Sequence, residues 1–257
     1  DVPYTRMLIH HNQADDTMLA CNDYGGIEMM GGGTGYIYNN ISRNAVGTKT
    51  FVKDVEIAKC LYLDGAFKVC SFNNILAGRF DAADPAYRNC AGYFMVWGFM
   101  NHLFNNTIIR FRNCLGGSSG NRSCFLGNII GDASQAFLAL NRPGDESMQG
   151  GGDTGASGAA GIPTLSFGGN LFYGHPENSR KGWGNFGYVG GRREENQKRT
   201  PIHGGDNLEE FSEKLAELGC RVSSVGSHFE GDVLKDPKGH DYRPGPAASD
   251  MGVPVVG

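Results

Sequence analysis

Short apolar segments that alternate with polar residues recur along this chain and end at Gly or Asn. One phrase has an aromatic or apolar residue, then Asn, then an aliphatic pair. It occurs as YIYNNIS (36–42), SFNNILA (71–77), LFNNTII (103–109), FLGNIIG (125–131) and SFGGNLFYG (166–174). A second phrase precedes the first three copies as GIEMMG (26–31), CLYLDG (60–65) and YFMVWG (93–98). Such short segments, rich in β-branched and aromatic residues, are typical of strands.

The irregular intervals between these phrases favour one fold class. The phrases return about every 20 to 40 residues, which is typical of a solenoid with loops of variable length, whereas propeller blades need a more even spacing. We therefore predict an all-β fold, a right-handed parallel β-helix, with a single domain over 1–257. Parallel strands lie about 4.8 Å apart, so the repeated Asn residues are expected to stack at one corner as an Asn ladder.

Composition excludes several other classes. The chain has 257 residues, of which 40 are Gly and 40% are hydrophobic, and its net charge is −4. The Gly residues follow no collagen period, and the hydrophobic content is too high for a disordered chain. No apolar stretch reaches the roughly 18 residues of a membrane span. The balanced charge predicts no nucleic-acid partner.

Three passages resemble a known superfamily. GGIEMM, CLYLDGAFKVCSFNNIL and the ending DYRPGPAASDMG resemble the right-handed parallel β-helix superfamily of pectate-lyase-like carbohydrate-active enzymes, in particular its bacterial glycoside hydrolases. The resemblance covers 5–175 and 225–255, and the ending departs from the family pattern by one extra residue before Asp250. It implies a polysaccharide or oligosaccharide partner, hydrolysis of glycosidic bonds, and an extracellular or periplasmic location.

The parts outside the repeat are of three kinds. Residues 208–218 (LEEFSEKLAEL) carry apolar residues at helical spacing before Gly219, which predicts one short helix near the C-terminus. The Gly-rich stretches 144–161 and 179–201 predict long loops. The start, DVPYTRMLIHHN, already resembles one strand-bearing coil (rung) of a β-helix and has no helix to cap that coil. We expect missing sequence or another chain to cover that coil end, the chain being the C-terminal portion of a larger β-helix.

Strand alternation assigns the second phrase to inward and outward columns. Aligned on their Gly residues, the three copies place these apolar residues inward: Ile27, Leu61 and Phe94, then Met29, Leu63 and Val96. The outward columns are then Glu28, Tyr62 and Met95, followed by Met30, Asp64 and Trp97. One outer face is expected to present carboxylates beside large aromatic rings, as a sugar-binding groove requires.

We predict three catalytic carboxylates, Glu28, Asp64 and Asp23. One serves as the general acid and another as the nucleophile or base. If Glu28 and Asp64 lie on adjacent rungs, their backbones are roughly 8 Å apart, which leaves both the retaining and the inverting geometry open. The competing interpretation is a solvated surface residue for Glu28 and Asp64, and a turn former for Asp23.

The predicted substrate-binding residues come from several segments: Tyr62, Trp97, His10, His11 and Arg110. His10 and His11 are adjacent, so one points inward and the other outward. Arg110 and Arg112 alternate on one strand face and are candidates for neutralising a uronate, the alternative being two solvent-facing arginines. His102 is interpreted as a structural histidine.

No cofactor is predicted. Asp81 and Asp84 lack the spacing of a calcium loop, so Ca²⁺ is kept only as an alternative. The seven Cys residues form no CxxC pair, which argues against a structural zinc site, and Cys114 and Cys124 are the candidates for a disulfide. The functional hypotheses are a glycoside hydrolase, an anionic-polysaccharide lyase, and a non-catalytic glycan-binding or structural β-helix.

Overall fold

A computed structural model describes residues 6–48, 58–78, 91–96, 98–118, 122–141, 165–174, 186–192, 200–222, 225–231, 233–246 and 248. Trp97, Asp81 and Asp84 lie outside these ranges, as does the predicted loop over 144–161. Within the described part, no helix is long and apolar enough to cross a membrane.

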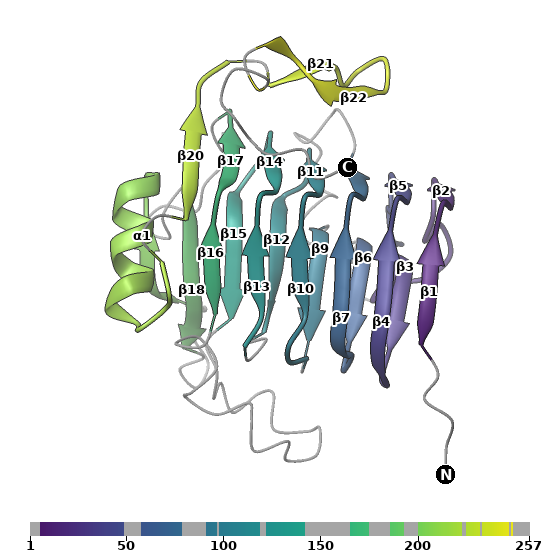
Figure 1. Ribbon diagram of the computed structural model, residues 1–257, viewed down its shortest axis with the longest axis horizontal. Coiled ribbons are helices and arrows are strands. Elements are labelled where there is room, and N and C mark those ends of the chain that lie inside the picture. Colours follow the sequence, from purple (N-terminus) through teal and green to yellow (C-terminus); the bar gives the residue numbers. More distant parts are fainter. Residues whose placement is uncertain are drawn as a thin grey trace.

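All described strands except a C-terminal hairpin form three sheets, which the chain visits in turn as it coils (Figure 1). Sheet A contains β1 (Met7–His10), β4 (Gly33–Tyr38), β7 (Phe67–Phe72), β10 (His102–Phe104), β13 (Cys124–Leu126) and β16 (Ser166–Gly168). Sheet B contains β2 (Gln13–Asp15), β5 (Ile41–Arg43), β8 (Ile75–Ala77), β11 (Thr107–Ile109), β14 (Ile129–Gly131), β17 (Asn170–Tyr173) and β20 (Gly226–Phe229). Sheet C contains β3 (Tyr24–Met30), β6 (Ala58–Asp64), β9 (Ala91–Val96), β12 (Asn113–Ser118), β15 (Ala136–Asn141), β18 (Gly187–Arg192) and β19 (Thr200–Gly205).

Parallel pairing through these sheets confirms the predicted all-β class and the parallel β-helix. Each complete coil runs from sheet C to sheet A to sheet B, and β3, β4 and β5 are the first to do so. From β1 to β18, neighbouring strands of these sheets pair in parallel with the equivalent strand one coil later, as β4 does with β7. The short strands follow from the sequence, because a Gly or Asn ends each apolar segment and turns the chain into the next sheet.

The predicted Asn ladder is present at the corner between sheets A and B. Its members are Asn12, Asn40, Asn74, Asn106, Asn128 and Asn170, and each amide bonds the next one at 2.9–3.0 Å. The residue before each of these Asn residues adopts a positive φ, 53° at Asn39 and 63° at Gly127, for example. Asn and Gly are the residues that tolerate this conformation best, which explains the repeated dipeptide.

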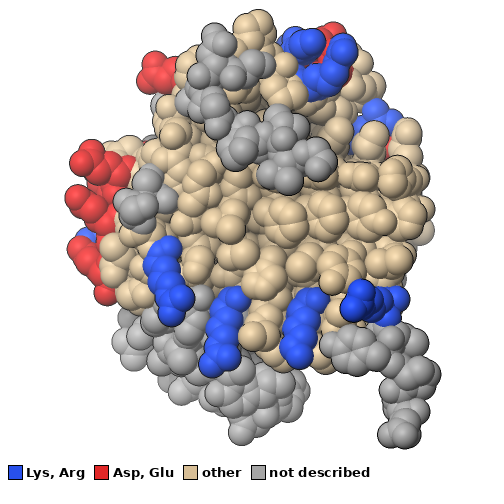
Figure 2. Space-filling view, viewed as in Figure 1, with Lys and Arg blue, Asp and Glu red and all other residues tan. Residues whose placement is uncertain are grey.

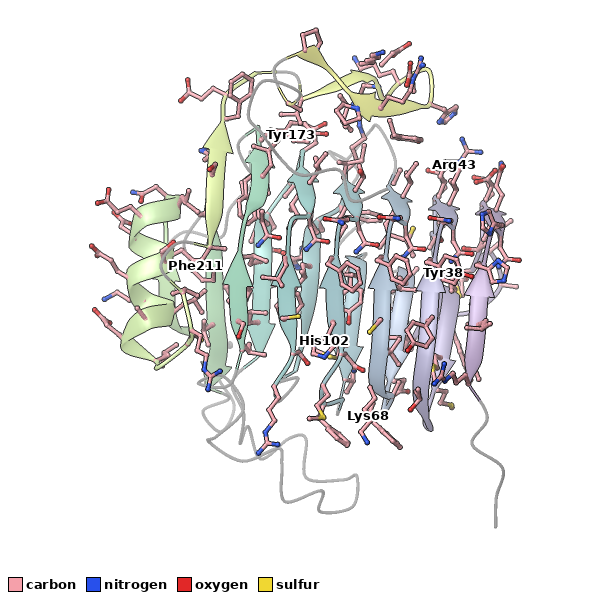
Figure 3. All side chains as sticks on the ribbon, in the orientation of Figure 1. Tyr38, Arg43, Lys68, His102, Tyr173 and Phe211 are labelled. Carbon is pink, nitrogen blue, oxygen red and sulfur yellow. The ribbon has the colours of Figure 1, made fainter. Side chains whose placement is uncertain are left out.

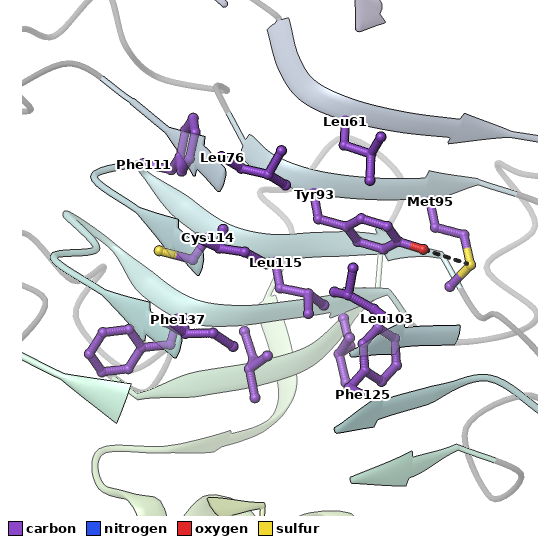
Figure 4. Packing of buried hydrophobic residues seen from close by; sticks show 14 of the residues in the cluster. Leu61, Leu76, Tyr93, Met95, Leu103, Phe111, Cys114, Leu115, Phe125 and Phe137 are labelled. Carbon is purple, nitrogen blue, oxygen red and sulfur yellow. Dashed lines mark hydrogen bonds between the residues drawn. The ribbon is translucent and has the colours of Figure 1, made fainter. Parts of the chain in front are cut away.

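Apolar side chains from all three sheets fill the interior of the coil. Leu61 and Tyr93 from sheet C meet Leu76 from sheet B and Leu103 from sheet A, and all four are fully buried (Figure 4). Rings also stack from coil to coil inside, since Phe125 and Phe167 lie 5.0 Å apart between centroids. Burial of this kind is the main stabilising contribution of the fold.

A helix near the C-terminus, α1 (Leu208–Glu217), covers one end of the coil, as Figure 1 shows. The prediction placed its end one residue later. Asn207 caps its first turn by accepting a hydrogen bond from the backbone N–H of Glu210. Phe211 and Leu215 form its buried face, and the ring of Phe211 lies 6.0 Å from that of Phe186.

The outer face of sheet B is covered by the C-terminal segment. A hairpin of β21 (Leu234–Asp236) and β22 (Asp241–Pro244) packs there, above the strands in Figure 1. A second apolar cluster joins both partners: Ala77, Ile109, Leu171, Tyr173, Val233, Leu234, Tyr242 and Ala248. The ending that carried part of the family resemblance therefore closes one side of the coil.

One predicted loop is partly a strand. Within 179–201, residues Gly187–Arg192 form β18, which extends sheet C and pairs with β19 in antiparallel fashion. Glycines at 187, 190 and 191 suggested a loop. Gly187 is instead required by packing, because a Cβ there would lie 2.9 Å from the ring of Phe211.

Candidate functional site

The register of sheet C decides which predicted residues share its outer face. As predicted, Glu28 lies opposite Tyr62 and Met30 lies opposite Asp64. The next pairing was predicted one residue out of register, because Tyr62 lies opposite Phe94 and Asp64 opposite Val96.

The correction turns Phe94 outward and Met95 inward, where Met95 is buried. Val96 holds the place beside Asp64 that we predicted for Trp97, and Trp97 itself lies outside the described residues. Aligning the copies on Asn74 and Asn106 of the ladder, instead of on their Gly residues, yields the observed register. The stretch from strand to ladder has the same length in both copies, but Gly98 aligns with Ala66 and not with Gly65, which caused the error.

A local departure from alternation brings Lys59 to the same outer face. Cys60 and Leu61 both have no exposed surface and belong to the core. Two consecutive inward residues break the alternation, although the register with β3 is the same on both sides of them, so the residues flanking them, Lys59 and Tyr62, both point outward. Strict alternation would place Lys59 inside, which is why it was missed. Its neighbour across the strand, Gly25, has room for no side chain, because a Cβ would lie 2.8 Å from that of Tyr62.

Lys59 lies at the centre of this cluster and is almost fully buried. Its Nζ is 2.5 Å from Oδ1 of Asp23, whose side chain is 71% exposed. The same Nζ lies 4.3 Å from the centroid of the Tyr62 ring and 5.2 Å from that of Phe94. These cation–π contacts and the ion pair together compensate for burial of the ammonium group.

Glu28 and Asp64 are half-buried carboxyls that influence each other. Burial raises the pKa of Glu28, and the negative charge of Asp64 raises it further, whereas a hydrogen bond from the backbone N–H of Gly25 (2.9 Å) and the charge of Lys59 oppose the rise. Burial and the charge of Asp23 raise the pKa of Asp64. Lys59 and a hydrogen bond with Tyr62 oppose that rise. The three predicted carboxylates therefore interact within one cluster.

Tyr62 does not have the predicted role of an exposed stacking platform. Only 4% of it is exposed, so neither ring face is available to a sugar. Burial raises its pKa, and the neighbouring charge of Asp64 adds to this effect, so the hydroxyl stays protonated and able to donate a hydrogen bond. Phe94, which contacts Tyr62 edge to face at 5.9 Å, is the more exposed ring.

The remaining predicted site residues lie on other sheets. His10 belongs to β1 of sheet A and stacks on Tyr38 at 4.8 Å, and His11 follows it at the corner with a φ of 56°. Arg110 follows β11 of sheet B, where its Nε is 3.5 Å from Oδ2 of Asp132. None of these three residues comes from the strands that hold the carboxylates.

His102 belongs to β10 of sheet A, on the face turned to the viewer in Figure 3, and its Nδ1 is 3.0 Å from Sγ of Cys124. Burial lowers its pKa. Cys124 is a free thiol, and so is Cys114, which is buried in sheet C. The predicted candidate disulfide between them is therefore wrong.

The described residues contain no group of three or more His, Cys, Asp or Glu side chains arranged to hold a metal ion. In the cluster on sheet C, Lys59 supplies the positive charge among the carboxylates.

Comparison with protein-family models and with curated proteins found no match for this chain. The parallel β-helix and its Asn ladder therefore rest on the structure itself.

Proposed function

We propose that this β-helix hydrolyses glycosidic bonds of a polysaccharide or oligosaccharide at the outer face of sheet C. One observation carries the proposal. Two half-buried carboxyls on adjacent strands, Glu28 and Asp64, both have raised pKa values and each has a different set of hydrogen-bond donors and charges around it. Pairs of carboxyls whose surroundings differ in this way are suited to divide the roles of acid and base.

Glu28 is the proposed general acid. Burial and the charge of Asp64 favour its protonated form. The N–H of Gly25 donates to Oε2, which leaves Oε1 to carry the proton toward the leaving-group oxygen. A carboxylic acid held in this way protonates the glycosidic oxygen as the bond breaks.

Asp64 is the proposed nucleophile or general base. The Tyr62 hydroxyl and the Lys59 ammonium both favour its ionised form, in opposition to burial. Lys59 is a positioning residue in this scheme, because it touches the ring of Tyr62 and is paired with Asp23. Asp23, the third predicted catalytic carboxylate, has φ 61° and so also fits the turn-former interpretation.

The separation of the two carboxyls leaves the stereochemical outcome to experiment. Glu28 and Asp64 are one strand and two residues apart in the register. This places their Cα atoms roughly 8 Å apart, and rotation of the side chains reaches either the shorter separation of retaining enzymes or the longer one of inverting enzymes. The anomer released first, observed by proton NMR, distinguishes the two.

The test is a screen of neutral and uronate-containing oligosaccharides for new reducing ends. With a substrate found, E28Q and D64N are each expected to lower kcat by at least about 100-fold. E213Q, which removes an exposed carboxylate from α1, is the matched control and is expected to leave turnover unchanged. Full turnover in both E28Q and D64N refutes the assignment. A product that contains an unsaturated uronate, which absorbs in the near ultraviolet, shows that the bond is cleaved by elimination and supports the lyase hypothesis instead of hydrolysis.

A further inference from the structure

A row of basic side chains follows one edge of sheet A, away from the carboxylate cluster. Figure 2 shows basic side chains along the lower edge of this face, and Figure 3 places Lys68 there. Arg6, Lys68, Arg122 and Arg221 are exposed. Arg6 precedes β1, Lys68 lies in β7, Arg122 precedes β13, and Arg221 bridges to β16 at Ser166.

The spacing of this row is set by the coil. The register places Arg6, Thr34, Lys68, Met100 and Arg122 in one column across successive strands. Basic residues therefore occupy alternate strands, about 10 Å apart. This distance is close to the Debye length at physiological salt, so neighbouring charges repel each other weakly while together they attract an extended anion.

The backbone adopts a positive φ along this column of residues. Lys68 and Arg122 have φ values of 56° and 54°, a conformation that disfavours residues other than Gly and Asn. At the Asn-ladder corner, the positions that need a positive φ include Asn73 and Gly127, which have φ values of 54° and 63°. Thr34 and Met100 in the same column have φ values of 50° and 54°, so all four positions share this conformation and two of them carry long basic side chains.

The face beside the row carries no opposing charge within the described part of the sheet. Its outward residues are Leu8, His10, Tyr36, Tyr38, Cys70, Phe72, His102, Phe104, Cys124, Leu126, Ser166 and Gly168, with no Asp or Glu among them. The rings of His10, Tyr38, Phe72 and Phe104 stack on one another at 4.8–5.0 Å along the coil. Stacked rings turn their edges outward, and the ring edge is the electropositive part of the π system.

We infer that this edge of sheet A binds an extended anionic polysaccharide that lies parallel to the coil axis. The inference goes beyond the proposed cleavage site, since it concerns a different sheet and does not depend on hydrolysis. A nucleic acid fits less well. Its bases need free aromatic faces, whereas the rings here already stack on each other.

The experiment measures binding of the intact protein to a polyuronate by calorimetry at low ionic strength, with a neutral glucan and single-stranded DNA as comparison polymers. K68G/R122G removes two charges and relieves the backbone, because Gly adopts the observed φ without strain. We expect the polyuronate affinity to fall about tenfold and the stability of the fold to be kept or raised. T34G/M100G, in the same column, is the matched control and is expected to change the affinity less than about twofold, and K68R/R122K is expected to bind as the wild type does.

Several results overturn the inference. These are no polyuronate binding by the wild type, equal binding by K68G/R122G, equal losses in both double Gly variants, or tighter binding of DNA than of polyuronate. Loss of binding in E28Q/D64N assigns the polymer to sheet C instead. If no sugar is cleaved but polyuronate binding depends on Lys68 and Arg122, the proposed function fails and this inference stands.

Discussion

Removal of one Asn from the middle of the ladder is expected to destabilise the fold strongly. The Oδ1 atom of Asn106 accepts hydrogen bonds from both the backbone N–H and the Nδ2 of Asn74, each at 2.9 Å. Its Nδ2 donates to the Ser71 and Phe104 carbonyls and to Asn128, each at 3.0 Å. N106A therefore leaves two buried donors of Asn74 without this acceptor. An unsatisfied buried polar group costs about 1–3 kcal/mol, so the expected loss is about 3–5 kcal/mol.

The first Asn of the described ladder is the internal comparison. Asn12 is exposed and donates from Nδ2 to Asn40 and to the carbonyl of His10. Water replaces these bonds, so N12A is expected to cost only about 0.5–1 kcal/mol. Equilibrium unfolding in guanidinium, followed by circular dichroism, measures both variants. Equal losses in N12A and N106A, or a loss below about 1 kcal/mol in N106A, refute the reasoning.

Three further predictions concern the cluster and the end of the coil. Because the folded-state pKa of Glu28 is raised, its contribution to stability is present below the ordinary carboxyl pKa and is lost as pH rises through the raised value. E28Q is therefore expected to unfold at a higher denaturant concentration than the wild type at pH 7, and at the same concentration as the wild type near pH 3. A gain in stability that persists unchanged at pH 3 contradicts this. K59M removes the charge that lowers the pKa of both Glu28 and Asp64, so the activity profile is expected to move to higher pH with little change in stability, and an unmoved profile argues against the coupling. F211A removes the fully buried ring by which α1 packs on the coil and is expected to lower the free energy of unfolding in guanidinium by about 3–5 kcal/mol. Glu213→Gln, at an exposed position of α1, is the neutral control. A loss below about 1 kcal/mol in F211A would show that α1 does not stabilise the coil.

The repeating part of the fold was predictable from the sequence, because one physical requirement recurs in it. Each coil needs a residue that tolerates positive φ and then an amide that bonds the coils on both sides, and the Asn-Asn and Gly-Asn dipeptides meet both needs. The same periodicity placed Glu28 and Asp64 on one outer face in the correct relative register. The amphipathic spacing over 208–218 predicted α1 to within one residue.

The rest depended on local geometry that alternation does not contain. The break in alternation at Cys60 and Leu61 turned Lys59 outward, and the sequence does not mark this break because both inward residues are apolar. The burial of Tyr62 depends on tertiary surroundings, which spacing cannot reveal. The basic row likewise becomes visible only when residues more than 50 positions apart, Lys68 and Arg122, fall into one column.

The hairpin over sheet B alters how the whole stack is expected to unfold. In a plain solenoid each coil touches only its neighbours, so stability is a sum of local contributions and the ends fray independently. Here Tyr242 of β22 packs in one cluster with Ala77, Ile109 and Leu171 from coils far apart along the axis, and its hydroxyl also bonds Arg43 of β5. A single C-terminal segment thus fastens early coils to late ones. Unfolding of the first coils is thereby coupled to release of the last residues of the described chain, and the stack gains the cooperativity of a globular domain.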